Sequence, residues 1–561
     1  MAGQAPLGSA GTATGSQVSE ISSSVLFTGG SVFDGTGFLE QGTHVLVTDG
    51  KITAVGTDVE PGTADIVDLD GGTLLPGFID AHAHPVSGGL QLLGCDLEKG
   101  SDSAAYLDIV ARYAAANPAL EWIIGGGWGL PAFPGGIPTR EALDSVVPGR
   151  PVFLYNRDHH GAWANSKALE LAGIDRRTPD PADGRIERDA GGEPVGMLQE
   201  GAMKLVSRLL PEITGEDKYR GLLAAQDSLL SLGVTGWQDA IVGPGYASID
   251  DTTDAYLRAA SAGTLIADVV GARWWQRDEG LEQLEGLRHY RQHNAAGRFR
   301  PTSVKMMLDG IVENHTAAML ASYLGHDGCA TGNSGLDFID PGELPRYVTA
   351  LDQAGFQVHF HALGDRAVRN ALNAIEAARA ARPGSARDTW IRHHLAHLQV
   401  VHPDDIPRFA ALGATANLQM LWAMNEPQMT ELTIPFLGAA RAAWQYPFAK
   451  LAASGAHLAG GSDWPVSSPD PLLAVHVAVN RALPETAGDP FLPRQAITRR
   501  TALAAYTSGT ARINGVAAFA GSIKAGYDAS FAVTDGDLAA IPDAEICQAS
   551  VTQTWVRGEL A

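Results

Sequence analysis

Two histidines stand two residues apart in the segment LLPGFIDAHAHP, at His82 and His84. In an extended strand, residues i and i+2 point to the same face, so both imidazoles would leave the backbone in one direction. Pro76 and Gly77 interrupt the chain before this run and Pro85 ends it, which predicts the carboxyl end of a short buried strand. Two neutral imidazoles on one face are a partial ligand set for a divalent metal ion. Core histidines satisfied by hydrogen bonds are the alternative for the pair taken alone.

A lysine lies inside a second apolar segment, VKMMLDG. The strand period of two places Lys305, Met307 and Asp309 on one face. Burial would lower the pKa of the lysine and free its amine to react with carbon dioxide. The resulting carbamate is a carboxylate on a long arm, suited to bridging two cations. An ion pair with Asp309 or Glu313 is the alternative.

Two further segments carry paired histidines. FQVHFHALGD places His359 and His361 on one face, and IRHHLAHLQ places His393 and His397 together with His394 turned away. We expect one histidine of each pair to be a metal ligand and the other to orient a ligand, because metal-bound imidazoles need an orienting partner.

An aspartate ends the last such segment, HLAGGSDWP, at Asp463. Taken alone, an aspartate at a strand end is also typical of a helix cap. In company with strand-end histidines it has the chemistry to accept and pass on protons beside a metal ion that generates hydroxide.

The segments that carry these residues belong to a repeated strand-then-helix rhythm. Such a rhythm predicts a parallel sheet of the α/β class. The eight expected strands are LLPGFIDAHAH, GVTGWQDA, LIADVVGAR, TSVKMMLDG, FQVHFHALG, IRHHLAHLQ, ATANLQML and HLAGGSDWP, with helices expected over 365–381 and 403–412. Eight such units predict a (β/α)8 barrel over residues 76–504, with its active site at the carboxyl ends of the strands.

Three other regions complete the predicted organisation. Residues 86–232 are too many for one crossover and predict a lid subdomain over the barrel mouth. Short β-rich pieces within 24–75 (SVLFTGG, HVLVTDG, KITAVG) and 505–561 (GSIKAG, DASFAVTDG, VTQTWVRGEL) predict antiparallel strands of one small β-sandwich built from both ends of the chain. Residues 1–23 are small and polar and predict a disordered tail.

Composition narrows the class of partner. The 561 residues carry a formal net charge of −23, which argues against nucleic acid or an anionic membrane surface as a partner. A run of eighteen apolar residues is absent from the sequence, so no spanning helix is expected. The cysteines, Cys95, Cys329 and Cys547, are odd in number and far apart. They predict no disulfide framework, which fits a reducing, cytoplasmic location.

The ordered set of HAH, Lys305, His361, His397 and Asp463 resembles the amidohydrolase superfamily over nearly the whole chain. DHHGAWANSKAL, GMLQEGA, VKMMLDG, VHFHALGDRAV, HHLAHLQ and GSDWPV are similar to the N-substituted formamide deformylase-like branch. DHHG replaces a more typical glycine-histidine-serine, and HHLAHLQ lacks an acidic residue before its last histidine. These departures concern the orientation of side chains rather than the metal site.

The resemblance implies a distorted (β/α)8 barrel, a terminal β-sandwich and one or two divalent metal ions, zinc first. The implied ligands are His82, His84, Lys305, His361, His397 and Asp463, with carbamylated Lys305 bridging a second ion. The expected reaction is hydrolysis of a non-peptide C–N bond, in an N-substituted amide or formamide. Asp463 would be general base and then acid, and the metal would polarise the carbonyl, helped by His359 or His160.

Two other functions remain open. The same barrel could hydrolyse esters or lactones, or act as a lyase. The chain could also be a metal-free scaffold protein, although the intact ligand set weighs against this. A homo-oligomer is expected by analogy with relatives alone.

The residues expected to contact substrate come mainly from the insertion. Several aromatic residues suggest a small apolar or aromatic substrate, with simple packing of the lid as the alternative. They are Trp128, Phe133, Trp163, Trp422 and Trp464. A polar set would bind substrate or else cap and brace the lid; it comprises Asp158, His160, Asn165 and Glu200.

Overall fold

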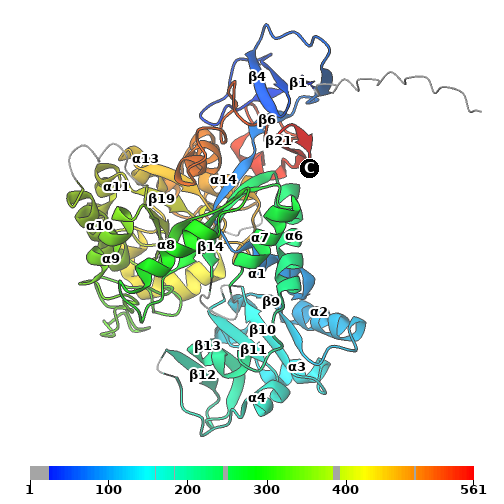
Figure 1. Ribbon diagram of the computed structural model, residues 1–561. Helices are drawn as coiled ribbons and strands as arrows, with labels where there is room; N and C mark the ends of the chain where they lie inside the picture. Colours follow the sequence, from blue (N-terminus) through cyan, green and yellow to red (C-terminus); the bar gives the residue numbers. More distant parts are fainter. Residues whose placement is uncertain (1–23, 158, 182, 244–250, 383–391, 485–487) are drawn as a thin grey trace, which may run out of the picture.

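The computed structural model describes residues 24–157, 159–181, 183–243, 251–382, 392–484 and 488–561. Figure 1 shows a β-rich part at one end, a barrel in the middle and an inserted α/β part at the other end. The predicted tail, 1–23, and Asp158 lie outside the described residues. Within these ranges, every helix is too short or too polar to cross a membrane.

The middle part is built on eight parallel strands in the order β20-β19-β18-β17-β16-β15-β14-β7. Their bounds are β7 (Phe78–Ala83), β14 (Val234–Val242), β15 (Asp268–Trp274), β16 (Phe299–Met307), β17 (Gln357–Ala362), β18 (His394–His397), β19 (Thr415–Leu418) and β20 (His457–Gly460). Each lies within a predicted segment or overlaps it, and β20 closes toward β7. The (β/α)8 prediction is therefore confirmed.

Helices cover the outside of this sheet. They include α6 (Gly215–Ser231), α7 (Thr253–Ala262), α8 (Gln283–His293), α9 (Leu344–Gln353), α10 (Asp365–Ala380), α11 (Ile406–Leu412), α13 (Phe448–Ala453) and α14 (Pro471–Asn480). Strand residues Val304, Val358 and Leu395 alternate with polar ones and share a core with Val348 of α9 and Leu372 of α10. This alternation turns the polar residues of the same strands toward the barrel interior.

The insertion after β7 folds around a sheet of its own, in the order β12-β13-β11-β10-β9-β8. The strands are β8 (Cys95–Asp96), β9 (Ile123–Trp128), β10 (Val152–Asn156), β11 (Gly161–Ala164), β12 (Gly184–Arg188) and β13 (Pro194–Glu200). Helices α2 (Ser103–Ala116), α3 (Arg140–Val146) and α4 (Ser166–Ala172) accompany them. We call this part, residues 95–200, the lid.

Helix α1 (Pro85–Leu93) leads from the barrel to the lid and packs closely on α6. A Cβ added at Gly89 would lie 1.8 Å from the carbonyl oxygen of Gly221, so only glycine permits this approach. Because α6 leads directly into β14, the last part of the predicted insertion belongs to the barrel wall.

The two chain ends meet in the β-rich part. One sheet runs β4-β3-β1-β5 and the other β2-β6-β21-β22-β23. The strands are β1 (Ser24–Thr28), β2 (Ser31–Val32), β3 (His44–Thr48), β4 (Lys51–Gly56), β5 (Asp65–Asp68), β6 (Thr73–Pro76), β21 (Phe531–Thr534), β22 (Val551–Val556) and β23 (Glu559–Leu560). Phe27, Val47, Leu74 and Phe531 share one core between them.

Three details of this part differ from the prediction. GSIKAG forms turns instead of a strand: Ile523 donates one hydrogen bond to the carbonyl of Asp34 and Gly526 donates one to the carbonyl of Ile52 in β4, and these do not make a ladder. The pairs β1–β5 and β2–β6 are parallel. Residues 505–513 pack on the barrel, since Ile513 shares a small core with Ala81 and Ala459, so the sandwich begins later than residue 505.

Candidate metal centre

Strand β7 and the turn after β20 bring two imidazoles onto one carboxylate oxygen. The Nε2 atoms of His82 and His84 both lie 3.0 Å from Oδ1 of Asp463. One ligand atom from each of the three residues lies within 4.8 Å of the other two. Burial, and then the charge of Lys305, lowers the pKa of His82 to about 3. Burial alone would raise the pKa of Asp463, but its contacts with the histidines hold that pKa well below the usual value.

Lys305 projects from β16 to the same point. Its Nζ lies 3.3 Å from Nε2 of His82, and burial lowers its pKa to about 7. The alternative ion pairs are not formed: Asp309 accepts backbone N–H groups from the 318 and 363–364 loops, and Glu313 accepts the hydroxyl of Thr433. An amine with this pKa is partly neutral near pH 7, as carbamate formation requires.

The two histidines of β17 take different positions. Nε2 of His359 lies 2.8 Å from Nδ1 of His82, on the side of that ring opposite Asp463. His361 lies further toward the carboxyl end of β17 and faces the cavity described below. One histidine of the pair therefore orients a ligand and the other is placed as a candidate ligand.

The alternation predicted for β18 is wrong. His393 lies outside the interior: its Nδ1 accepts the N–H of Val358, and its Nε2 lies 3.1 Å from Asp352. His394 turns inward instead, with its ring 4.0 Å from that of His359. His397 still reaches the centre, because a left-handed backbone (φ +80°) at the strand end rotates its side chain inward.

His397 supplies the observation that best fits a metal ion. Its ring lies 4.8 Å from that of His82 and 4.5 Å from that of His361, centroid to centroid. Both of its nitrogens are buried without a hydrogen-bond partner among the described residues. An unpartnered buried imidazole costs free energy, which coordination of a cation would recover. The donor set of imidazole nitrogens, one carboxylate and one lysine suits zinc or a similar divalent ion.

Two of these residues have a strained backbone conformation. Asp463 (φ +60°), like His397, is a non-glycine residue in the left-handed region. Such conformations cost about 1–3 kcal/mol each and persist only where the surroundings fix them. Gln419 accepts the N–H of His397 at 2.6 Å, and the carbonyl of His82 accepts the N–H of Asp463 at 2.7 Å. The neighbouring strands thus hold both side chains at the centre.

Sequence reasoning missed two buried carboxylates beside this centre. Asp80 accepts the N–H groups of His82 and Ser462 and so ties β7 to the end of β20. Asp239, at the end of β14, accepts the hydroxyl of Tyr256 at 2.6 Å. Burial raises the pKa of each carboxyl to about 6. The strand-end rule applied to the histidines would have found Asp239 in GVTGWQDA.

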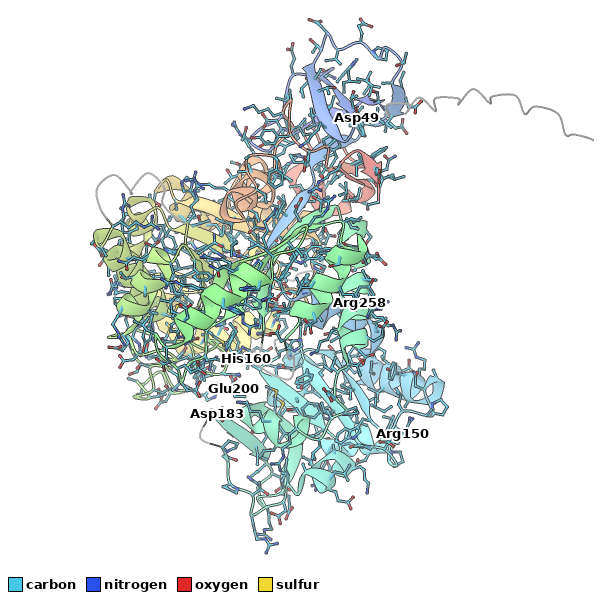
Figure 2. All side chains as sticks on the ribbon, viewed as in Figure 1. Asp49, Arg150, His160, Asp183, Glu200 and Arg258 are labelled. Carbon is cyan, nitrogen blue, oxygen red and sulfur yellow. The ribbon has the colours of Figure 1, made fainter. Side chains whose placement is uncertain are left out.

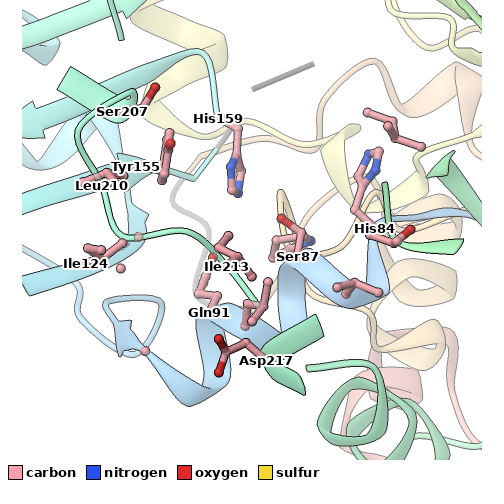
Figure 3. Close-up of a pocket in the computed structure, with 18 of the residues that line it drawn as sticks. His84, Ser87, Gln91, Ile124, Tyr155, His159, Ser207, Leu210, Ile213 and Asp217 are labelled. Carbon is pink, nitrogen blue, oxygen red and sulfur yellow. The ribbon is translucent and has the colours of Figure 1, made fainter. Parts of the chain in front are cut away.

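A cavity of about 980 Å³ opens from the centre toward the lid. All six predicted metal ligands line it, and so do residues of the lid and of the segment that follows it. Figure 3 shows His84 on the barrel side and Ile124, Tyr155, His159 and Leu210 on the other, with Ile213 beside Ser87 between them.

His160 and Glu200 lie where the lid meets the barrel, as Figure 2 shows. Nδ1 of His160 is 2.9 Å from Oε1 of Glu200, and Asn314 of the barrel donates to the same oxygen at 3.4 Å. His160 also lines the cavity. His359 lies behind His82 and away from the cavity wall, so the suggestion that it polarises a substrate carbonyl does not fit.

Four predicted substrate contacts lie inside the lid instead. Trp128 and Trp163 are fully buried in its core, and their indole N–H groups donate to the carbonyls of Leu154 and Thr139. Asn165 caps α4 and is likewise fully buried. Phe133 packs beside both tryptophans. Their large apolar or amide groups fill the lid, whose small sheet needs a core of its own.

The other two tryptophans lie beside the metal centre. Trp422 stacks on His397 with ring centroids 5.2 Å apart, and its N–H donates to Ser467. Trp464 is buried, and its carbonyl accepts the N–H of His84 at 2.7 Å. Both therefore brace ligands of the centre, and neither faces the cavity.

Comparison with known proteins agrees with this geometry. The model of the amidohydrolase family matches residues 65–561. The chain belongs to the amidohydrolase family.

Relatives extend this assignment along the chain. This amidohydrolase is 30% identical over 542 residues to the putative amidohydrolase YtcJ of Bacillus subtilis (strain 168), covering 93% of this chain and 97% of that protein. It is 29% identical over 554 residues to the N-substituted formamide deformylase of Arthrobacter pascens, covering 92% and 94%. The prediction of an enzyme of this class, acting on C–N bonds other than peptide bonds, is confirmed.

A solved structure shares the whole arrangement. An uncharacterized metal-dependent hydrolase from Pyrococcus horikoshii OT3 superposes on the amidohydrolase with a TM-score of 0.71 at 25% identity, covering 93% of this chain and 99% of that one. The lid and the sandwich therefore occur together with the barrel in a second protein.

Proposed function

We propose that this amidohydrolase is a metal-dependent hydrolase that cleaves the C–N bond of an N-substituted amide or formamide. The observation that carries the proposal is the convergence of two imidazoles on Asp463, with Lys305 against the first of them, in the wall of a cavity of about 980 Å³. The name of the deformylase relative supports the choice of bond.

His82, His84, His361, His397 and Asp463 would hold the metal, with zinc as the first choice, and carbamylated Lys305 would bridge a second ion. When bound, the metal supplies hydroxide near neutral pH and polarises the scissile carbonyl. Burial lowers the pKa values of His82, His361 and His397, so each of these rings is neutral and has one nitrogen free of a proton, as a ligand must have. Lys305 forms its carbamate by attack of the neutral amine on carbon dioxide, with release of one proton.

Asp463 is the residue that moves protons. As an ionised carboxylate at the cavity floor, it accepts the proton of the attacking water and later gives it to the leaving amine. Its strained backbone aims the carboxylate into the site, and the imidazoles beside it stabilise its charge. The cytoplasmic location and a homo-oligomer, both predicted above, are kept as parts of this proposal.

The substrate class is tested by a screen on metal-replete enzyme. N-alkyl formamides, N-acyl amines, carbamates and lactones are incubated with the enzyme, and released amine or acid is measured. Amine release from the formamides or amides supports the proposal. Turnover of lactones or esters alone would favour the second function. A purified chain without stoichiometric metal, and indifferent to chelator, would favour the scaffold.

The role of Asp463 is tested by Asp463→Asn. The amide keeps the shape but accepts no proton, so we expect kcat to fall at least about 10³-fold. Bound metal, measured by elemental analysis, should fall much less, because several other ligands remain. Normal turnover in this variant would contradict the assigned role.

A further inference from the structure

The segment that follows β10 places a histidine where the backbone favours glycine. His159 has a left-handed backbone (φ +61°) and is held there by its N–H, which donates to the carbonyl of Asn156 at 3.1 Å. The side chain of Asn156 accepts the N–H of Gly161 at 2.9 Å and fixes the same turn. An L-residue pays for this conformation, whereas glycine would not. A side chain kept at such a position indicates a use for the imidazole.

The imidazole of His159 faces the substrate cavity. It lines the cavity together with His84 and Asp463, and Figure 3 shows the rings of His159 and His84 on opposite sides of the same space. The ring of Tyr155 stacks on it at 5.7 Å. Nε2 of His159 is buried and has no hydrogen-bond partner among the described residues. A buried nitrogen without a partner is a binding group for a ligand that supplies one.

We propose that His159 accepts a hydrogen bond from the N–H group of the substrate and so selects secondary amides over N,N-disubstituted amides and esters. This inference rests on the proposed function, since it assumes that the reacting carbonyl faces Asp463. The substituent on nitrogen then extends toward the room on the lid side, along Ile124, Leu210 and Ile213. The amide N–H, the polar group nearest that substituent, comes to lie against His159.

The chemistry of the ring suits this role. Burial lowers the pKa of His159 to about 4, so the imidazole is neutral near pH 7. A neutral imidazole with its proton on Nδ1 accepts a hydrogen bond at Nε2. An N-methylated amide or an ester offers no hydrogen there, and the buried nitrogen would stay unpaired in their complexes. Such a loss discriminates strongly between otherwise similar substrates.

The test compares three compounds that differ only in the group that joins the formyl carbon to the substituent: an N-(phenylalkyl)formamide (NH), its N-methyl derivative (N–CH3) and the corresponding formate ester (O). For each, kcat/KM is measured with wild-type enzyme, His159→Gly, His159→Gln and Asp70→Gly. Glycine removes the imidazole and relieves the strain of the positive φ at residue 159. Glutamine keeps a hydrogen-bond acceptor at a similar distance from the backbone. Asp70 is the matched control, an exposed residue of the sandwich with φ +48°.

The preference is the ratio of kcat/KM for the secondary formamide to kcat/KM for the N-methyl compound. We expect this ratio to be about tenfold higher in wild type than in His159→Gly. His159→Gln should recover part of that preference, and Asp70→Gly should keep all of it. Ester hydrolysis should not fall in His159→Gly. An equal loss on all three compounds, or no loss on any, would overturn the proposal, because a structural role does not depend on one substrate hydrogen.

Failure of the proposed function gives a different result. If wild type turns over no formamide, equilibrium binding of the same compounds to metal-replete protein is compared between wild type and His159→Gly. If wild type, but not His159→Gly, binds the secondary formamide more tightly than the other two compounds, the result would support His159 as the acceptor for the N–H group. Equal binding of the compounds, or no binding, would overturn that role.

Discussion

At the scale of single residues, the centre depends on which nitrogen of each imidazole is used. His82 contacts His359 through Nδ1 and presents Nε2 to Asp463 and Lys305. For Nε2 to bind a metal, the proton of the neutral ring must sit on Nδ1 and be donated to His359. His359 therefore fixes the tautomer of a ligand without touching the cavity.

Replacing His359 should weaken metal binding without removing a ligand. His359→Leu takes away the acceptor for the Nδ1 proton of His82, and we expect metal affinity to fall about 10–100-fold. His359→Gln keeps an acceptor at a similar reach and should retain most of the affinity. Competition with a chromophoric chelator measures both. Wild-type affinity in the leucine variant would mean that His82 needs no orienting partner.

At the scale of elements, side chains at strand and helix ends hold the parts in register. Asn165 begins α4: its side-chain oxygen, Oδ1, accepts the N–H groups of Val152 and Ala168, and its side-chain NH2 group donates to the carbonyls of Val147 and Arg150. One fully buried side chain thus joins β10, α3 and α4. The polar motif residue acts as a brace of the lid.

Asn165→Ala should destabilise the lid strongly. It leaves several buried backbone groups unpaired, each costing about 1–3 kcal/mol, so we expect at least about 3 kcal/mol less stability in urea unfolding. The matched control is Asp102→Ala, which removes an exposed cap with a single bond to Ala105 and should cost about 1 kcal/mol. A raised KM in a fully stable Asn165→Ala enzyme would instead support a contact with substrate.

A buried ion pair joins α9 to the start of β18. Asp352 lies against Arg382 at 2.6 Å and His393 at 3.1 Å. Burial alone would raise the pKa of Asp352, but hydrogen bonds from these partners outweigh it and hold that pKa below the usual value. A carboxylate whose pKa is depressed on folding stabilises the fold above its ordinary pKa of about 3.9, and this contribution is lost as the pH falls further.

Asp352→Asn should therefore cost stability in a pH-dependent way. At pH 7 we expect a loss of about 3–5 kcal/mol, as for a broken buried ion pair. The difference in free energy of unfolding between wild type and variant should decrease as the pH falls below about 4, because the wild-type carboxylate becomes protonated. Urea unfolding followed by circular dichroism across pH 3.5–7 measures this difference. A difference independent of pH would mean that packing, and not charge, accounts for it.

At the scale of the whole molecule, most of the architecture followed from residue patterns. Apolar runs and turn residues located all eight barrel strands, and the strand-end rule found the centre, because parallel strands bring their carboxyl ends to one face. The left-handed backbone of His397 was not predictable. The side chain of Gln419, which follows a neighbouring strand, accepts the N–H of His397 and holds this conformation. For the lid tryptophans the sequence left substrate contact and simple lid packing both open, and the structure shows packing, because the lid buries a core of its own.

Cys95 lies in the separate core of the lid, so its reactivity can be used to follow unfolding of the lid. Cys95 is fully buried among apolar residues of the lid, such as Val110 and Leu154, and none of them belongs to the barrel core. Burial, and then the nearby Asp96, raises the pKa of the Cys95 thiol to about 12, so the reactive thiolate is scarce. Cys329 is exposed and Cys547 half-buried.

Thiol labelling should therefore separate opening of the lid from unfolding of the barrel. With an aromatic disulfide reagent in native buffer, Cys329 should react first and Cys95 not at all. In a urea series on Cys329→Ser protein, Cys95 should become reactive at lower urea than the loss of the barrel's circular dichroism, because fewer apolar side chains hold the lid together. Coincident transitions would mean that lid and barrel unfold as one cooperative unit, with the contact between α1 and α6 as its coupling.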